Sequence, residues 1–200
     1  MSFSRFDFTE KYWNSLNQKS RDLYEEVRPM IRPRSACHYR VGEIENTISI
    51  FVDDCSRHGG RFDLEPDFQR GHVWDEGKQI AYVESFMRHT APATFKFNCA
   101  TYNDFVQKGD LNPDDMVCID GLQRITALRR FVAGEIKVFG HDCAYFNDTP
   151  FSMQRMNYTF IMEIFTFTHK KDLLQFYIDL NSGGVVHTQE EIERVRKMMS

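Results

Sequence analysis

The sequence has no long apolar run, no regular cysteine spacing and no excess of positive charge, and each absence excludes a class of protein. No run approaches the roughly 20 apolar residues of a membrane-spanning helix, and the N-terminus lacks a signal-peptide core, so we expect no membrane association. The five cysteines are scattered without a C-x-x-C pair: Cys37, Cys55, Cys99, Cys118 and Cys143. This pattern indicates a reducing, cytoplasmic setting in which thiols serve as small core residues.

The net charge of −4 argues against indiscriminate coating of DNA but leaves room for a local basic groove. Basic residues gather at two places, one around Arg124, Arg129 and Arg130 and one at the C-terminal end: Arg194, Arg196 and Lys197. The C-terminal cluster is either a solvated helix face or a contact for nucleic acid.

With 42% hydrophobic and 14% aromatic residues, the 200-residue chain can bury a substantial core. We expect helices over 9–28, from Ile44 to Gly59-Gly60, from Asp75 through Met87, from the 120–124 turn to Gly134, from Thr168 through Leu180 and after Thr188. Strands are expected at 38–41, 93–98 and 116–119, with two or three more within 136–167, and irregular connections at 61–74 and 103–115. This order predicts an α+β fold, a small mixed β-sheet surrounded by helices, over 36–200, after an N-terminal helical extension over 1–35.

The most informative stretch is residues 116–130, MVCIDGLQRITALRR. An apolar run ends abruptly in Asp120-Gly121, and helical periodicity begins at Ile125 and Leu128. The pattern predicts a buried strand, a tight glycine turn and a helix, whose first N–H groups suit phosphate. The alternative is an Asp-Gly turn with Arg124 as a salt-bridged arginine.

A second stretch, residues 66–75, packs arginine, glutamine, histidine and aromatic residues into a loop before a helix: PDFQRGHVWD. Arg70 offers a fixed fork of donors for phosphate, and Gly71 allows close backbone approach. Trp74 either stacks on a base or packs the helix onto the core, and His72 is either a proton carrier or a surface hydrogen-bonding group. A third stretch, residues 179–184, ends a helix with Asn-Ser-Gly-Gly, which is a normal C-cap or a flexible phosphate contact.

Together the three stretches resemble the ParB/sulfiredoxin-like superfamily, and within it the N-terminal domain of GmrSD-type modification-dependent restriction proteins. The stretches that carry the resemblance are DFQRGHVW at 67–74, IDGLQRITAL at 119–128 and LNSGG at 180–184, in the family's order over roughly residues 40–195. Four positions depart from the family pattern: Leu122 replaces a glutamine, His72 an aromatic residue, Ala127 a threonine and Asp179 an arginine.

The resemblance implies binding of ATP or another nucleoside triphosphate together with Mg²⁺. The residues implied in nucleotide binding are Gln69, Arg70, Gly121, Gln123, Arg124, Thr126, Asn181, Gly183 and Gly184. Asp120 and Arg124 are the implied catalytic residues, and Asp120 is also the candidate ligand for Mg²⁺, with Glu65 and Asp67 as second choices. His72 and Trp74 are candidates for stacking on a base.

The leading hypothesis is a nucleotide-dependent phosphotransferase acting on a hydroxyl acceptor, a hydroxymethylated pyrimidine in DNA, as in a phage DNA-base kinase of this superfamily. The chain ends soon after the third motif, where the restriction proteins append a nuclease domain, so we expect it to act through the nucleotide-binding fold or with a partner. The alternatives are an NTPase or nicking subunit of a modification-dependent restriction system, and a non-catalytic nucleotide- or DNA-binding module. The expected partners are DNA with modified bases and a nucleoside triphosphate, with a protein partner or a homodimer left open.

Overall fold

The computed structural model describes residues 9–27, 32–69, 71, 73–102, 109–182 and 189–199. The chain divides into two compact units, residues 1–33 and residues 34–200. In the described parts of the chain, no helix combines the length and the apolar character needed to cross a membrane.

The first unit contains two short helices, α1 (Glu10–Ser15) and α2 (Gln18–Val27), where the sequence predicted one helix over 9–28. Thr9 caps α1 by accepting a hydrogen bond from the Tyr12 amide. The Asn17 side chain accepts a bond from the Ser20 amide at 2.8 Å, which starts a new helix. The single-helix prediction was wrong because this asparagine acts as a second N-cap rather than continuing the first helix.

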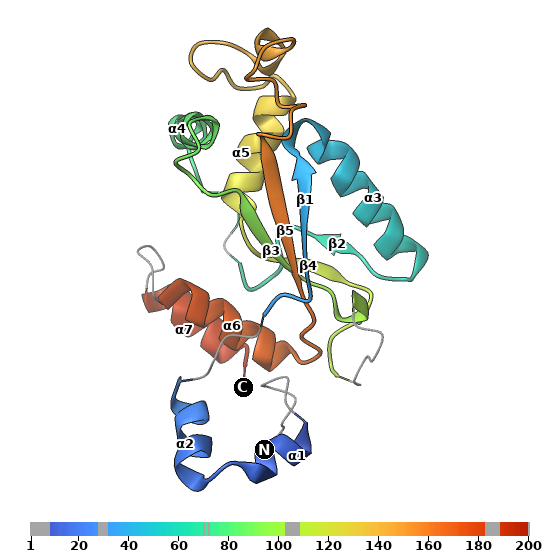
Figure 1. Ribbon diagram of the computed structural model, residues 1–200, viewed down its shortest axis with the longest axis vertical. Coiled ribbons are helices and arrows are strands. Elements are labelled where there is room, and N and C mark those ends of the chain that lie inside the picture. Colours follow the sequence, from blue (N-terminus) through green and yellow to red (C-terminus); the bar gives the residue numbers. More distant parts are fainter. Residues whose placement is uncertain are drawn as a thin grey trace. The chain divides into compact units, whose positions relative to one another are not determined.

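The second unit is built on a five-stranded mixed sheet in the order β1-β5-β3-β4-β2 (Figure 1). Its strands are β1 (Ser35–Arg40), β2 (Phe62–Asp63), β3 (Thr94–Asn98), β4 (Met116–Asp120) and β5 (Thr159–Phe165). β3 lies parallel to β5 and antiparallel to β4, while β1 pairs antiparallel with β5 and β2 pairs parallel with β4. The predicted α+β class, with a small mixed sheet and flanking helices, is confirmed.

Three helices cover one face of the sheet: α3 (Ile44–Arg57), α4 (Glu76–Met87) and α5 (Leu122–Val132). Their apolar positions share one core with alternate residues of the strands, including Phe95, Phe97 and Phe160. Complete burial of an aromatic side chain of this size stabilises the fold by about 1.5–3 kcal/mol. On α5 the apolar positions Ile125 and Leu128 are both buried, which confirms the predicted helix.

Two further helices, α6 (Lys170–Ser182) and α7 (Gln189–Lys197), pack against each other near the end of β5. Phe176 of α6 contacts Phe165 and Phe167, with ring centroids 4.7 and 5.1 Å apart. Phe165 lies on the face of β5 opposite to the buried Phe160, since the two are an odd number of residues apart. α6 therefore covers the end of the second sheet face.

The region 136–167 contains one strand, β5, where the sequence predicted two or three, and all of it belongs to the described part of the chain. Before β5 the chain forms only a bridge between Val138 and His141 and a short 3-10 helix at Cys143–Phe146. The strand prediction was wrong because the apolar residues here, such as Phe146 and Met153, are buried by an irregular loop rather than by a ladder of strands.

Candidate functional site

The central feature of the site is the turn from β4 to α5 at Gly121. Gly121 has a φ of 115°, and a Cβ added there would lie 2.6 Å from a ring carbon of Phe95. Glycine is required both by this left-handed backbone and by the close approach of β3. As the N-cap of α5, Gly121 has no side chain to cover the first amides of the helix, which makes this helix start suited to an anion.

Asp120 and Arg124 stand on either side of this turn and form an ion pair. Nη2 of Arg124 donates to Oδ2 of Asp120 at 2.8 Å, across one helical turn. The Asp120 side chain is 42% exposed and the Arg124 side chain 18% exposed. The salt bridge expected under the simpler interpretation is therefore present, and it also places a carboxylate and a guanidinium together beside a helix start that has no side-chain cap.

The two glutamines assigned to nucleotide binding are both bonded to main chain. Gln123 Oε1 accepts from the amides of Val73 and Trp74 at 3.0 Å each, and its Nε2 donates to the Gly71 carbonyl at 3.2 Å. Gln69 Nε2 donates to the Cys118 carbonyl at 2.6 Å. The side chains of Gln69 and Gln123 thus attach the described residues of 66–74, which we name the motif segment, to β4 and α5.

Other predicted site residues bond within their own helices or pack on the core. Thr126 donates to the Leu122 carbonyl, and Asn181 donates to the Tyr177 carbonyl. Trp74 packs against the core, with its ring 5.5 Å from that of Tyr82. Leu122, the departure from the family's glutamine, is buried, so this position contributes packing.

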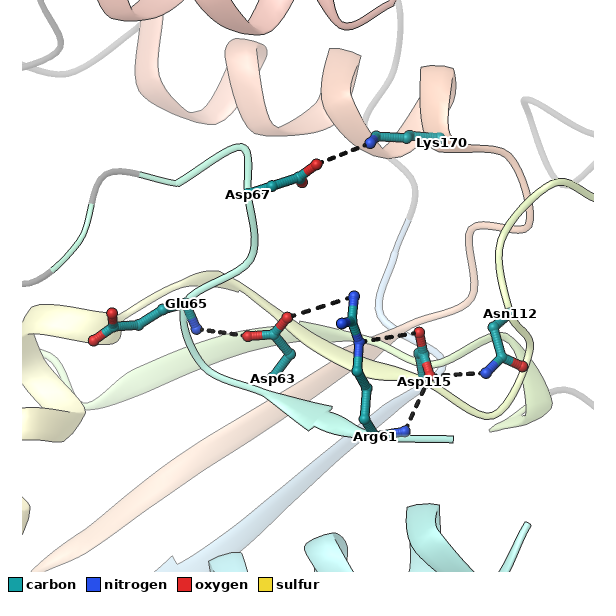
Figure 2. Close-up of polar contacts among 7 residues, drawn as sticks. All are labelled: Arg61, Asp63, Glu65, Asp67, Asn112, Asp115 and Lys170. Carbon is teal, nitrogen blue, oxygen red and sulfur yellow. Dashed lines mark hydrogen bonds and ion pairs between the residues drawn. The ribbon is translucent and has the colours of Figure 1, made fainter. Parts of the chain in front are cut away.

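Four predicted residues, Arg70, His72, Gly183 and Gly184, lie outside the described residues. Of the second-choice residues, Asp67 lies in a different polar cluster, and Glu65 contacts that cluster only through its backbone amide while its carboxylate points away (Figure 2). Lys170 at the start of α6 donates to Asp67 at 3.1 Å, and the Glu65 amide donates to Asp63.

In the same cluster, Figure 2 shows the Arg61 side chain between two carboxylates, those of Asp63 and Asp115. The guanidinium lies 3.8 Å from Asp63 and 3.5 Å from Asp115, whose carboxylate also accepts a bond from Asn112. A hollow of about 120 Å³ opens beside Arg61, Asp67, Asp115 and Lys170. Arg61 thus joins Asp115 of the 112–115 loop to Asp63 of β2, while Lys170 joins α6 to Asp67 at the start of the motif segment.

Arg194 of the C-terminal basic cluster has a role that the sequence did not indicate. Its guanidinium donates to the carbonyls of Asp67 and Phe68, at 3.0 and 3.1 Å. Neither of the predicted alternatives for this cluster, a solvated face or a nucleic-acid contact, anticipated a bond to the protein's own main chain. Arg194 thus connects α7 to the motif segment.

Sequence reasoning also missed Lys96 and Glu163, which pair across β3 and β5 beside Asp120. Lys96 stands opposite Glu163 in one ladder and opposite Asp120 in the other. The sequence did contain one signal, a lysine that alternates with buried phenylalanines in Thr94-Phe95-Lys96-Phe97. The cross-strand partners of Lys96, however, depend on the order of the strands in the sheet.

The donor set beside Gly121 suits phosphate better than it suits a metal held by protein alone. Arg124 and the first amides of α5 are donors for an anion, and Asp120 is a single carboxylate. Within the described ranges, no group of three or more histidine, cysteine, aspartate or glutamate side chains could hold a metal ion. A Mg²⁺ ion at Asp120 would therefore share its ligands with bound phosphates and water, as is usual for this ion.

The site lies within a region that matches a known family. The model of the GmrSD restriction endonuclease, N-terminal domain, matches residues 50–196. The chain belongs to this family. The GmrSD match includes the motif segment, the β4–α5 turn, Lys96 and Glu163. No curated protein and no solved structure matches the chain.

Membership in the GmrSD family places the chain among components of DNA restriction systems, with DNA as the implied partner. The wider assignment to the ParB/sulfiredoxin-like superfamily stays a prediction, as do the roles of the individual site residues.

Proposed function

We propose that this GmrSD N-terminal domain binds a nucleoside triphosphate at the β4–α5 turn and hydrolyses it as part of a modification-dependent restriction system acting on DNA. The observation that carries the proposal is the Asp120–Arg124 pair beside the glycine start of α5, in the region that matches the family. A partly exposed carboxylate, a guanidinium and backbone amides without a side-chain cap are groups that phosphoryl transfer uses around a phosphate.

Each group has a distinct task in this proposal. The first amides of α5 and the remaining donors of Arg124 bind phosphate oxygens and stabilise the charge that develops on the transferred phosphoryl group. Asp120 orients a water molecule and accepts its proton as the oxygen attacks the γ-phosphorus, while the bond to the nucleoside diphosphate breaks. Gln69 and Gln123 act indirectly, because they hold the motif segment against the turn.

The metal has a limited place in this scheme. When bound, Mg²⁺ would neutralise phosphate charge, and Asp120 is the residue that would hold it. The Arg124 bond leaves the Asp120 side chain 42% exposed, so the carboxylate remains accessible to a cation or to water.

Phosphoryl transfer to a hydroxyl group of a modified base, such as a hydroxymethylated pyrimidine in DNA, is a second candidate function. It uses the same residues, with the base hydroxyl in place of water and its proton passing to Asp120. The exposure of the Asp120 carboxylate favours it as a candidate, since a DNA-borne hydroxyl must reach this group from outside.

One experiment distinguishes these reactions. The protein is incubated with Mg²⁺, γ-labelled ATP or GTP, and DNA containing unmodified, hydroxymethylcytosine or hydroxymethyluracil bases. Phosphate release stimulated by modified DNA supports the restriction NTPase, and label on the DNA supports the phosphotransferase. Strand breaks are scored in the same samples to detect nicking.

Asp120→Asn should abolish either reaction while binding persists, and Asp53→Asn, an exposed carboxylate on α3, serves as the control. Nucleotide binding without either reaction indicates a non-catalytic module. Absence of nucleotide binding by the wild-type protein overturns the proposal.

A further inference from the structure

We propose that Lys96 is a second cation of the nucleotide site. In the absence of nucleotide its ammonium pairs with Glu163, so that Glu163 and phosphate compete for Lys96. The inference rests on the proposed function, because it assigns two more residues to the same site. It predicts that the two members of one ion pair affect nucleotide affinity in opposite directions.

The order of the strands brings the relevant side chains into one row. Lys96 on β3 is the register partner of Glu163 on β5 and of Asp120 on β4. Residues paired across neighbouring strands project to the same face of a sheet, and a β-bulge between Lys96 and Phe97 shifts the β3–β4 register beside this pair. The row therefore runs Glu163, Lys96, Asp120, and Arg124 follows one helical turn later.

The contact between Gly121 and Phe95 shows to which face of the sheet Lys96 projects. Gly121 faces Phe95, whose side chain is fully buried in the core. Neighbouring residues of a strand point to opposite faces, so Lys96 projects away from that core. Lys96 also lies over the Phe165 ring, 5.8 Å from its centroid, on the face that α6 covers at its end.

Lys96 and Glu163 form an ion pair that is largely removed from solvent. Their side chains are 20% and 23% exposed, and the Lys96 ammonium donates to Glu163 Oε2. A lysine is a point charge on a flexible four-carbon stem, so its ammonium can turn from Glu163 toward an anion arriving beside Asp120. Glu163 keeps the ammonium paired in the absence of ligand, which limits the affinity for phosphate.

A purely structural cross-strand pair makes a different prediction. In that case removal of either partner lowers the stability of the sheet, and nucleotide affinity falls equally or stays unchanged in both variants. The opposite signs expected here are thus the distinguishing result.

The test measures binding of a non-hydrolysable ATP or GTP analogue with Mg²⁺ by titration calorimetry. Lys96→Met should weaken binding about tenfold or more, as expected for loss of a charge-assisted bond to phosphate, and Lys96→Arg should restore most of it. Glu163→Gln should tighten binding several-fold. The ion pair Arg129–Glu45, which joins helices α5 and α3 at 2.6 Å, gives the control variants Arg129→Met and Glu45→Gln, for which we expect unchanged affinity.

The outcomes separate this inference from the proposed function. If wild type binds the nucleotide and Lys96→Met binds equally well, Lys96 is not in the site, while the proposed function stands. If Glu163→Gln weakens binding as much as Lys96→Met does, the pair is structural and the inference is wrong. If wild type binds no nucleotide, both proposals are overturned. Should Lys96→Met fail to fold, Glu163→Gln alone still tests the inference, because tighter nucleotide binding supports it and weaker binding contradicts it.

Discussion

Gly121 is the residue on which the site's geometry depends most directly. Its φ of 115° and the approach of Phe95 both require the absence of a side chain. Gly121→Ala should lower the free energy of unfolding by about 2–4 kcal/mol, because backbone strain and a steric clash add.

Gly134 provides the matched control, since its φ is 75° and a Cβ there would meet nothing within 4 Å. Gly134→Ala carries only the backbone cost, about 1 kcal/mol. Equal losses in the two variants, measured by urea denaturation, would show that the contact with Phe95 is unimportant.

Substitution of Gln123 tests whether side-chain hydrogen bonds hold the motif segment in place. Gln123→Ala removes three bonds to the main chain at Gly71, Val73 and Trp74, each worth about 0.5–1.5 kcal/mol. Hydrogen exchange at the Val73 and Trp74 amides should become faster. Gln123→Glu keeps the accepting oxygen and should preserve most of the protection, whereas equally fast exchange in both variants would contradict this role.

At the scale of elements, the motif segment is held by four neighbours that are distant in sequence. Gln69 ties it to β4, Gln123 lies on α5, Lys170 begins α6 and Arg194 belongs to α7. In addition, Phe68 is buried against Tyr177 of α6, with ring centroids 5.2 Å apart. The C-terminal helices thus help to place the first motif beside the second.

Arg194→Ala should loosen the first part of the motif segment without unfolding the sheet. Loss of two bonds to the carbonyls of Asp67 and Phe68 predicts faster proteolysis or hydrogen exchange around residues 66–69. Arg196→Ala, an exposed position on the same helix, is the control. Identical exchange in both variants would indicate that α7 does not restrain the segment.

Helices and strands with clear apolar periodicity and clear capping or turn residues at their ends could be predicted from the sequence. Asp75 caps α4 by accepting from the Lys78 amide, and the apolar run at 116–119 is the buried strand β4. The helix over 9–28 and the extra strands within 136–167 were wrong, because an asparagine cap and a loop that buries aromatics both override local propensity.

The candidate site could be predicted only where its residues are adjacent in sequence. Asp120, Gly121 and Arg124 lie in one stretch, so their proximity follows from a strand, a turn and one helical turn. Lys96 and Glu163 join them through the strand order, which no local pattern reveals. The bonds of Gln69 and Gln123 to the main chain likewise depend on long-range packing.

At the scale of the whole molecule, buried thiols make the fold sensitive to alkaline pH. Burial raises the pKa of Cys118 to about 12 and that of Cys55 to about 11. An unfolded thiol titrates near 8.5. The stability that comes from keeping these thiols neutral is fully present below about pH 8.5 and is lost as pH rises toward 11–12.

The free energy of unfolding should therefore fall more steeply above about pH 9 in wild type than in Cys118→Ala, by up to about 1.4 kcal/mol per pH unit. Cys37→Ala, which alters an exposed thiol, should retain the wild-type slope. The measurement is the free energy of unfolding between pH 8 and 10.5. If it falls equally with pH in wild type and in Cys118→Ala, the raised pKa of the Cys118 thiol is contradicted.

The central claim is that the β4–α5 turn binds the phosphates of a nucleotide. The most direct measurement is the dissociation constant of a nucleoside triphosphate with Mg²⁺ for wild type, Arg124→Ala and the control Arg129→Ala. Arg129 lies on the same helix but pairs with Glu45 of α3. The account predicts that Arg124→Ala weakens binding by about 1.5–3 kcal/mol while Arg129→Ala leaves it unchanged. Unchanged affinity in Arg124→Ala would reduce the Asp120–Arg124 pair to a structural salt bridge and contradict the account.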